Sequence, residues 1–215
     1  EGASGRWFIP QNNDLSMDWT KASYDDSAWN RGGSGFGFDP DGRYSFFIGN
    51  GSDLQSAMRG KSSSAFIRLP FSLPQLNYVQ GVKLAVNYND AFVAYVNGVE
   101  VARRNAPSGE LRWDSIAVSS RSQQSALFAE EIDLMQSEAL LNTGENILAI
   151  HGMNAAVDDG DFLLNPVIEA ELIASPFFSF LEQNGLEFDA NELPGGDSDG
   201  DNNIRFDIIK NCRNL

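Results

Sequence analysis

The chain has 215 residues, of which 42% are hydrophobic and 15 are phenylalanines, and this fits one β-sandwich with an appendage better than two full domains. The 30 acidic residues outnumber the 15 basic ones and give a formal net charge of −15, which makes nucleic acids and anionic membrane surfaces poor partners. No run of about 18 apolar residues occurs, so we expect no membrane insertion. The chain begins at Glu1 without a Met or a charged-then-apolar leader, as expected of a mature or trimmed product whose targeting peptide has been removed.

The first 60 residues are rich in Gly, Asp, Asn and aromatic residues, and we expect long loops with edge strands there. The glycines between positions 32 and 37 suggest a phosphate cradle. They lack both the Lys-Ser/Thr pair of a P-loop and a strand-to-helix context, so we predict no phosphate site. A glycine-rich loop with Phe36 and Phe38 packed inward is the interpretation that we favour.

Two apolar runs follow with the character of strands. The first covers residues 65–69, with Phe71 beyond, and we expect Pro70 and Pro74 to end it. The second covers residues 82–88 and alternates regularly. Its inward-facing positions are predicted to be Val82, Leu84 and Val86.

The strongest local signal is a hairpin turn at Asn97-Gly98, between the runs 91–96 and 99–103. Two β-prone runs separated by Asn-Gly predict a two-residue hairpin, because both residues tolerate the positive φ angles of a type I′ turn. Alternation sends one set of side chains to each face of the first strand. The two sets are Phe92, Ala94 and Val96 on one face, and Val93 and Tyr95 on the other.

Further strands are predicted at residues 127–134, 146–151 and 162–172, and Thr143-Gly144 is typical of a turn before the second of them. Many short strands without alternating helices favour an all-β fold over a parallel α/β fold. We therefore predict an antiparallel β-sandwich or jelly roll, followed by a short helical and acidic C-terminal appendage.

The composition changes after Ser175-Pro176, which places the domain boundary between residues 1–174 and 175–215. Residues 177–184 predict a short amphipathic helix that Gly185 would end. The remainder is acidic and rich in turn residues. Cys212 is the only cysteine, so an internal disulfide is excluded, and we interpret it as a free thiol on the tail rather than an intermolecular bridge.

Several segments, in the right order, resemble a galactose-binding-like module found in secreted, multidomain bacterial proteins. They are YDDSAW at 24–29, GSGFG at 33–37, NDAFVAYVNGVEVARRN at 89–105, NILAIHGMN at 146–154 and DFLLNP at 161–166. The resemblance covers about residues 7 to 174. It implies a jelly-roll sandwich that accompanies carbohydrate-active or surface-anchored proteins, with neighbouring domains in a larger secreted or cell-surface protein. It does not imply one ligand, because this architecture hosts many.

The tail is similar to the acidic repeats that follow such modules, in which Asp-x-Asp-Gly-Asp loops bind calcium. Asp197, Asp199 and Asp201 would repel one another unless a hard cation relieved the repulsion, and Asn203 could add an oxygen ligand. The spacing departs from an EF-hand loop, because position twelve is Ile208 rather than Glu. Asp207 would substitute only in a shortened loop. The alternative is a solvated acidic linker without a cation.

Other polar residues have simpler interpretations. The acids of Asp158-Asp159-Gly160-Asp161, and Asp25 and Asp26 ahead of Trp29, are predicted to form turns, with Trp29 in the core. His151 is the only histidine and is predicted to be a satisfied structural residue, so the usual catalytic triads and zinc clusters are largely excluded. A pair of carboxylates could still cleave glycosides, but no pair stands out.

Binding of a sugar requires an exposed aromatic face together with amide, Arg or carboxylate groups. One candidate stretch contains Arg43, Tyr44, Phe46 and Phe47, flanked by Asp41 and Asn50. A second leads from the hairpin through Arg103 and Arg104 to Arg112 and Trp113. Each aromatic residue is alternatively a core residue, and Asn89 and Asp90, which precede the hairpin, are alternatively turn formers.

Arg103, Arg104 and Arg112 form a basic cluster on an acidic protein. Its functional interpretation is recognition of a carboxylated or sulfated glycan, because Arg binds such groups bidentately. The alternative is local pairing with Glu100, Glu110 or Asp114.

The sequence therefore predicts a noncatalytic carbohydrate-binding module that binds calcium and has a polysaccharide or glycan as its partner. Two alternatives stay open. One is a structural or adhesive spacer that is stabilised by calcium and has no affinity for sugars. The other is a glycoside-cleaving enzyme.

Overall fold

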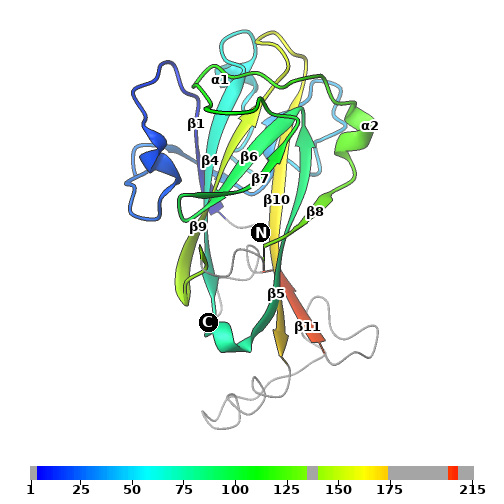
Figure 1. The fold of residues 1–215 in the computed structure, drawn as a ribbon. Helices are drawn as coiled ribbons and strands as arrows, with labels where there is room; N and C mark the ends of the chain where they lie inside the picture. Colours follow the sequence, from blue (N-terminus) through cyan, green and yellow to red (C-terminus); the bar gives the residue numbers. More distant parts are fainter. Residues whose placement is uncertain (1–3, 135–139, 174–202, 208–215) are drawn as a thin grey trace.

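Two antiparallel β-sheets packed face to face form the body of the molecule (Figure 1). The computed structural model describes residues 4–134, 140–173 and 203–207. Six strands form the first sheet in the order β2-β1-β4-β9-β6-β7, and four form the path β11-β10-β5-β8 of the second, with β3 also paired to β10. This arrangement confirms the predicted all-β sandwich.

The first-sheet strands are β1 (Ser4–Phe8), β2 (Asn30–Gly33), β4 (Ser64–Leu73), β6 (Ala91–Val96), β7 (Val99–Arg104) and β9 (Gly144–Met153). The second-sheet strands are β3 (Phe36–Phe38), β5 (Val79–Asn89), β8 (Glu130–Asp133), β10 (Phe162–Ile173) and β11 (Asn203–Asp207). The short helices are η1 (Met17–Thr20), α1 (Gln55–Met58), η2 (Leu76–Tyr78) and α2 (Gln123–Ala126). None of the helices in the described ranges is long and apolar enough to cross a membrane.

The main core lies between the sheets and follows the predicted alternation. Val82, Leu84 and Val86 of β5 are fully buried in it. The facing set from β6 consists of Phe92, Ala94 and Val96. Because alternate side chains of a strand point to opposite faces, the remaining β6 residues belong to a second cluster on the outer face of the first sheet.

This outer cluster is aromatic, and the segment that contains η1 covers it. Trp19 stacks on Phe66 with ring centroids 4.4 Å apart, and Trp29 stacks on Phe8 at 5.3 Å. Val93 and Tyr95 of β6 pack into the same cluster. The first sheet is therefore buried on both faces in this region, which explains why the β6 run is apolar throughout.

The Asn97-Gly98 turn is confirmed. Asn97 has a φ of 51° and Gly98 a φ of 95°, as a type I′ turn requires. The Asn97 side chain donates to the carbonyl oxygen of Leu140 at 2.7 Å and accepts from the Ile147 amide at 2.9 Å. The turn is thereby fixed to the start of β9.

Three elements differ from the prediction. Pro70 does not end its strand, because β4 continues through it to Leu73. Proline has no backbone N–H to donate, but β1 pairs with β4 only at Phe66–Arg68. Pro70 therefore lies beyond the hydrogen bonds between these two strands. The run predicted at 127–134 is reduced to β8, with α2 before it. The glycine-rich segment forms β2 and β3, although Phe36 and Phe38 are buried as expected.

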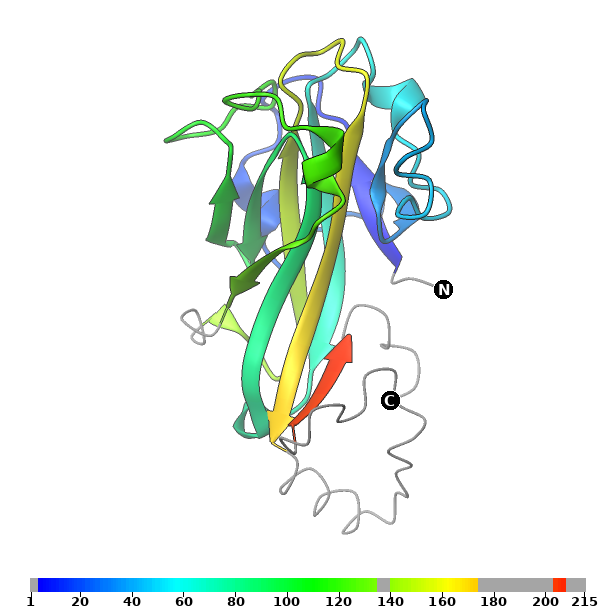
Figure 2. The same ribbon diagram turned by 90° about the vertical axis from the view of Figure 1, so that its right-hand side faces the viewer.

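Four connections meet at one end of the sandwich, at the top in Figures 1 and 2, and we call this end the rim. The strand register places them together, because β4 and β10 begin there and β5, β7 and β9 finish there. The rim consists of residues 39–63, Asp90, 105–129 and 154–161. The Asn97-Gly98 turn lies at the opposite end of β6 and β7.

The predicted appendage contributes one described strand, β11, which extends the second sheet along β10. Asn203 lies opposite Ile173 and Asp207 opposite Glu169. The predicted helix at 177–184 and Cys212 lie outside the described residues.

Candidate functional site

The rim loop formed by residues 39–51, called here the Phe46 loop, is held in one shape by its own first residue. The Asp39 carboxylate accepts the backbone N–H groups of Asp41 at 2.9 Å, Arg43 at 2.6 Å and Tyr44 at 3.1 Å. A carboxylate that caps several amides fixes a turn in this way. The loop is therefore preorganised.

Tyr44 anchors the loop to the sandwich. Its ring is fully buried against Ala126 and Leu163, and its hydroxyl lies 2.9 Å from the Asn89 amide nitrogen, which donates to it. Burial raises the pKa of this hydroxyl well above its usual range. The prediction of Tyr44 as a candidate sugar contact is not supported by this position, because a buried ring offers no face to a ligand.

The same loop leaves one aromatic ring bare. Phe46 exposes 73% of its surface, the largest fraction among the large hydrophobic residues of the described ranges. Its ring centroid lies 4.0 Å from that of Phe47, which is half-buried and packs against the Tyr44 cluster. Phe47 thus supports an outward-facing ring.

Arg43 is exposed on the Phe46 loop. Within residues 4–134, 140–173 and 203–207, its guanidinium enters none of the ion pairs found. The loop therefore presents an apolar ring and an available cation, the two kinds of group that bind the faces and the polar substituents of sugars.

Asn89 and Asp90 are buried beneath the surface of the rim, since each exposes only 2% of its surface. Asn89 donates to Asp161 at 2.9 Å as well as to Tyr44. Their predicted role as ligand contacts does not match this burial. They hold the rim segments together from within.

The basic cluster is neutralised by local acids. Arg103 pairs with Glu100 at 2.7 Å and Arg112 with Asp114 at 3.0 Å, as the local-pairing interpretation expected. Arg104 pairs with Glu130 of β8. That partner is 26 residues away in the sequence and reaches Arg104 only through the folding of β8, so the sequence pattern could not reveal it.

Trp113 lies on the connection between β7 and β8 and is half-buried. Its backbone amide donates to the Asn13 side chain at 3.4 Å. Of the predicted aromatic candidates, Trp113 and Phe47 thus keep part of their surface open, while Tyr44 does not. The two stretches predicted from the sequence both lie on the rim, but on different connections.

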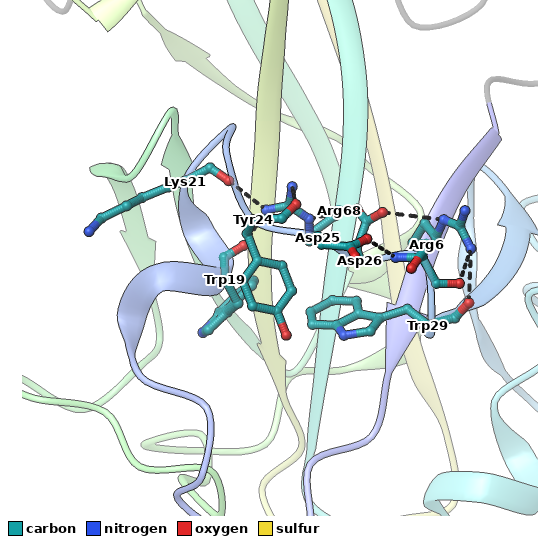
Figure 3. Close-up of polar contacts among 9 residues, drawn as sticks. Arg6, Trp19, Lys21, Tyr24, Asp25, Asp26, Trp29 and Arg68 are labelled. Atoms are coloured by element: carbon teal, nitrogen blue, oxygen red, sulfur yellow. Dashed lines mark hydrogen bonds and ion pairs between the residues drawn. The ribbon is translucent and has the colours of Figure 1, made fainter.

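The covering segment from Trp19 to Trp29, which includes YDDSAW, forms a structural clamp around a buried arginine (Figure 3). Arg68 of β4 donates from Nε to Asp26 at 2.7 Å, and its remaining nitrogens donate to the carbonyl oxygens of Trp19, Lys21 and Tyr24. Arg6 reaches Asp26 from the other side at 3.3 Å. Each of these bonds joins the covering segment to the first sheet.

The other motif residues behave as predicted. Asp25 accepts the Ser27 amide at 2.9 Å, which is a turn-forming contact, and Trp29 is buried. Sequence reasoning missed Arg68. The available signal was an arginine inside an apolar run, because a buried charge requires a partner and two aspartates stand together at 25 and 26.

His151 is a satisfied structural residue, as predicted. It is buried, its Nε2 lies 2.8 Å from the Ser64 hydroxyl, and its ring meets Phe66 edge to face. Desolvation, with a smaller contribution from the charge of Arg103, lowers its pKa to about 3. His151 is therefore neutral at physiological pH and enclosed by the first sheet.

The predicted calcium ligands are only partly described. Asp197, Asp199 and Asp201 lie outside the described residues. Asn203 and Asp207 lie at the two ends of β11, and four residues of extended strand separate their backbones by about 13 Å. One calcium shell, with ligands at about 2.3–2.6 Å, would not include both. In the described ranges no group of three or more His, Cys, Asp or Glu side chains could hold a metal.

Comparison with known proteins gives distant structural likenesses. No known family model matches the sequence, and no curated protein matches it. A Bacteroides uniformis β-glucuronidase is 11% identical with a TM-score of 0.44, over 80% of this chain and 21% of that one. A β-glycosidase from Bacteroides vulgatus is 15% identical with a TM-score of 0.40, over 80% of this chain and 23% of that one. A Streptomyces avermitilis α-L-rhamnosidase complexed with L-rhamnose is 14% identical with a TM-score of 0.37, over 82% of this chain and 12% of that one.

The chain thus spans less than a quarter of the length of each of these enzymes. Likenesses of this degree do not discriminate between functions. The proposal that follows rests on the residues of the chain itself.

Proposed function

We propose that the chain is a noncatalytic carbohydrate-binding module of a larger secreted or surface protein, and that the Phe46 loop is its principal contact with a glycan. The observation that carries the proposal is the bare Phe46 ring, which Phe47 supports. The same loop also carries the exposed Arg43, whose guanidinium enters no ion pair within the described residues. Exposing a large aromatic residue on a rigid loop has no benefit for folding. An aromatic face packs against the apolar side of a pyranose ring, and a guanidinium binds hydroxyl or carboxylate groups.

Replacement of Phe46 by alanine is expected to weaken retention in affinity gels roughly two- to tenfold, because an aromatic contact contributes about 0.5–1.5 kcal/mol beyond area burial. The gels would contain xylan, alginate or xanthan, which represent plant, algal and bacterial polysaccharides. Val99→Ala is the control, since Val99 is also exposed but lies next to the Asn97-Gly98 turn, opposite the rim.

Trp113→Ala separates the two candidate loops. If Trp113→Ala abolishes retention and Phe46→Ala does not, the contact lies on the connection between β7 and β8 and the assignment to the Phe46 loop is wrong. Absence of retention on every polysaccharide would favour the spacer alternative. Release of reducing ends during incubation would instead favour glycoside cleavage.

We further propose that the tail binds calcium through Asp197, Asp199 and Asp201, with Asn203 as a fourth oxygen ligand. The support is their alternate spacing in the sequence, which would place three carboxylates around one hard cation. Asp207 is not included, because β11 carries it about 13 Å from Asn203.

Calorimetric titration of the chelator-treated chain with calcium is expected to give a binding heat that Asp199→Asn weakens at least tenfold. Asp158→Asn removes one exposed carboxylate from the other acidic stretch and is expected to leave the heat unchanged. An equal loss of calcium affinity in Asp199→Asn and Asp158→Asn would indicate nonspecific charge screening. No heat in the unmodified chain would show that the tail is a solvated linker.

A further inference from the structure

The Asp90 side chain connects two rim segments that are distant in the sequence. One carboxylate oxygen accepts the Arg121 amide at 2.5 Å, and the other accepts the Ala155 amide at 2.8 Å. Arg121 belongs to the connection between β7 and β8, which also carries Trp113. Ala155 belongs to the connection between β9 and β10. One buried side chain therefore fixes the positions of both.

The ionised form strengthens this double contact. A carboxylate is an acceptor at both oxygens, whereas a carboxylic acid has one oxygen that carries a proton and donates. Protonation of one Asp90 oxygen would therefore weaken its hydrogen bond to the amide that it accepts, because a hydroxyl oxygen is a poorer acceptor than a carboxylate oxygen. Asp159 is the acceptor for the added proton, because a side-chain hydrogen bond to Asp159 contributes to raising the Asp90 pKa.

The environment favours protonation of Asp90. Burial, followed by smaller contributions from the charge of Asp159 and its hydrogen bond, raises the Asp90 pKa to about 6, although the two amides oppose the shift. Burial also raises the pKa of Asp161, which accepts from Asn89 next to Asp90. The Arg121 guanidinium contacts Tyr88 instead of the Asp90 carboxylate: it lies 4.1 Å from the Tyr88 ring centroid and donates to the Tyr88 carbonyl.

We infer that Asp90 is a proton-operated latch of the rim: as a carboxylate it holds the β7–β8 and β9–β10 connections together, and as an acid it holds one of them less firmly and donates to Asp159. Asp90 is then a positioning residue rather than a ligand contact. This inference does not depend on what the Phe46 loop binds, since the latch acts on the protein alone.

Amide hydrogen exchange followed by NMR measures the latch without any ligand. After correction for the intrinsic exchange rate, the protection of the Arg121 or the Ala155 amide is expected to fall at least fivefold between pH 7 and pH 5, with a midpoint near 6. The Gly33 amide, which donates to the Asn50 carbonyl at 2.9 Å, is the internal reference and should keep its protection.

Two variants separate the latch from general loosening. Asp159→Asn removes the acidic neighbour and should lower the midpoint of the transition. Asp90→Asn offers one acceptor oxygen at every pH, so one of the two amides should be unprotected already at pH 7, with no further change to pH 5. If Asp90→Asn does not fold, the Asp159→Asn midpoint still decides the question. Constant protection in the unmodified chain, or an unchanged midpoint in Asp159→Asn, would overturn the inference.

Discussion

Replacement of Arg68 by methionine is expected to lower the free energy of unfolding by about 3–5 kcal/mol, the usual cost of removing one partner from a buried ion pair. Methionine fills a similar volume, so the effect is electrostatic rather than the result of a large cavity. The carbonyl oxygens of Trp19 and Tyr24 would lose the Arg68 donor, whereas the Lys21 carbonyl would keep the Tyr24 amide as a donor. Buried acceptors without partners add to the cost.

Urea denaturation measures this effect, and Arg112→Met supplies the control. Arg112 also pairs with an aspartate, but both side chains are exposed and solvent screens the pair, so Arg112→Met should change stability far less than Arg68→Met. Equal destabilisation in the two variants would show that the clamp around Arg68 contributes no more than a surface pair. Because the clamp fastens the segment that covers the outer aromatic cluster, we also expect the fluorescence of Trp19 and Trp29 to shift toward that of solvated indole.

The second large effect is expected at Gly35, which precedes β3 and packs against Phe47 of the Phe46 loop. Gly35 has a φ of 88°, and a Cβ added there would overlap the carbonyl oxygen of Phe47. Its own carbonyl accepts the Gly49 amide at 2.8 Å, so the backbone on both sides is fixed. Gly35→Ala should therefore lower stability by about 1–2 kcal/mol through backbone strain, with about 1–3 kcal/mol more from overpacking.

Gly42→Ala is the matched control for this prediction. Gly42 belongs to the same loop and has a φ of 78°, but an added Cβ meets nothing within 4 Å. Gly42→Ala should therefore lose only the stability that corresponds to backbone strain, and thermal unfolding measures this loss. If the Phe46 loop binds the glycan, Gly35→Ala should also reduce retention in affinity gels, while Gly42→Ala should retain it. Identical behaviour of the two alanine variants would show that the approach of Phe47 to Gly35 does not matter.

The fold was predictable from the sequence to the extent that it depends on local patterns. The Asn97-Gly98 turn and the alternation of residues 82–88 follow from backbone preferences and burial, both of which are visible in short windows. Pro70 was misjudged because its effect depends on where β1 stops alongside β4, and that is a long-range property. The short β2 and β3 strands are likewise set by pairing with distant partners.

The candidate site was predictable only as a region. The sequence singled out residues 43–47 as a candidate stretch, but it could not show that Phe46 is exposed while Tyr44, two residues earlier, is buried through its contacts with Asn89 and Leu163. Likewise, the sequence could not show that Asp90 would be enclosed by connections that begin 15 and 64 residues later at Asn105 and Asn154. Such neighbours are decided by topology, not by local composition.

The strand β10 extends from the rim to the tail strand β11 and keeps these two parts of the molecule apart. Its 12 residues extend from the rim to Ile173, beside which the tail strand begins, and this corresponds to about 40 Å of extended chain. Electrostatic influence in physiological salt decays over about 8 Å. Charge neutralisation at the tail by calcium would therefore leave the potential around Arg43 and Phe46 unaltered, so cation loading and glycan affinity should be thermodynamically uncoupled.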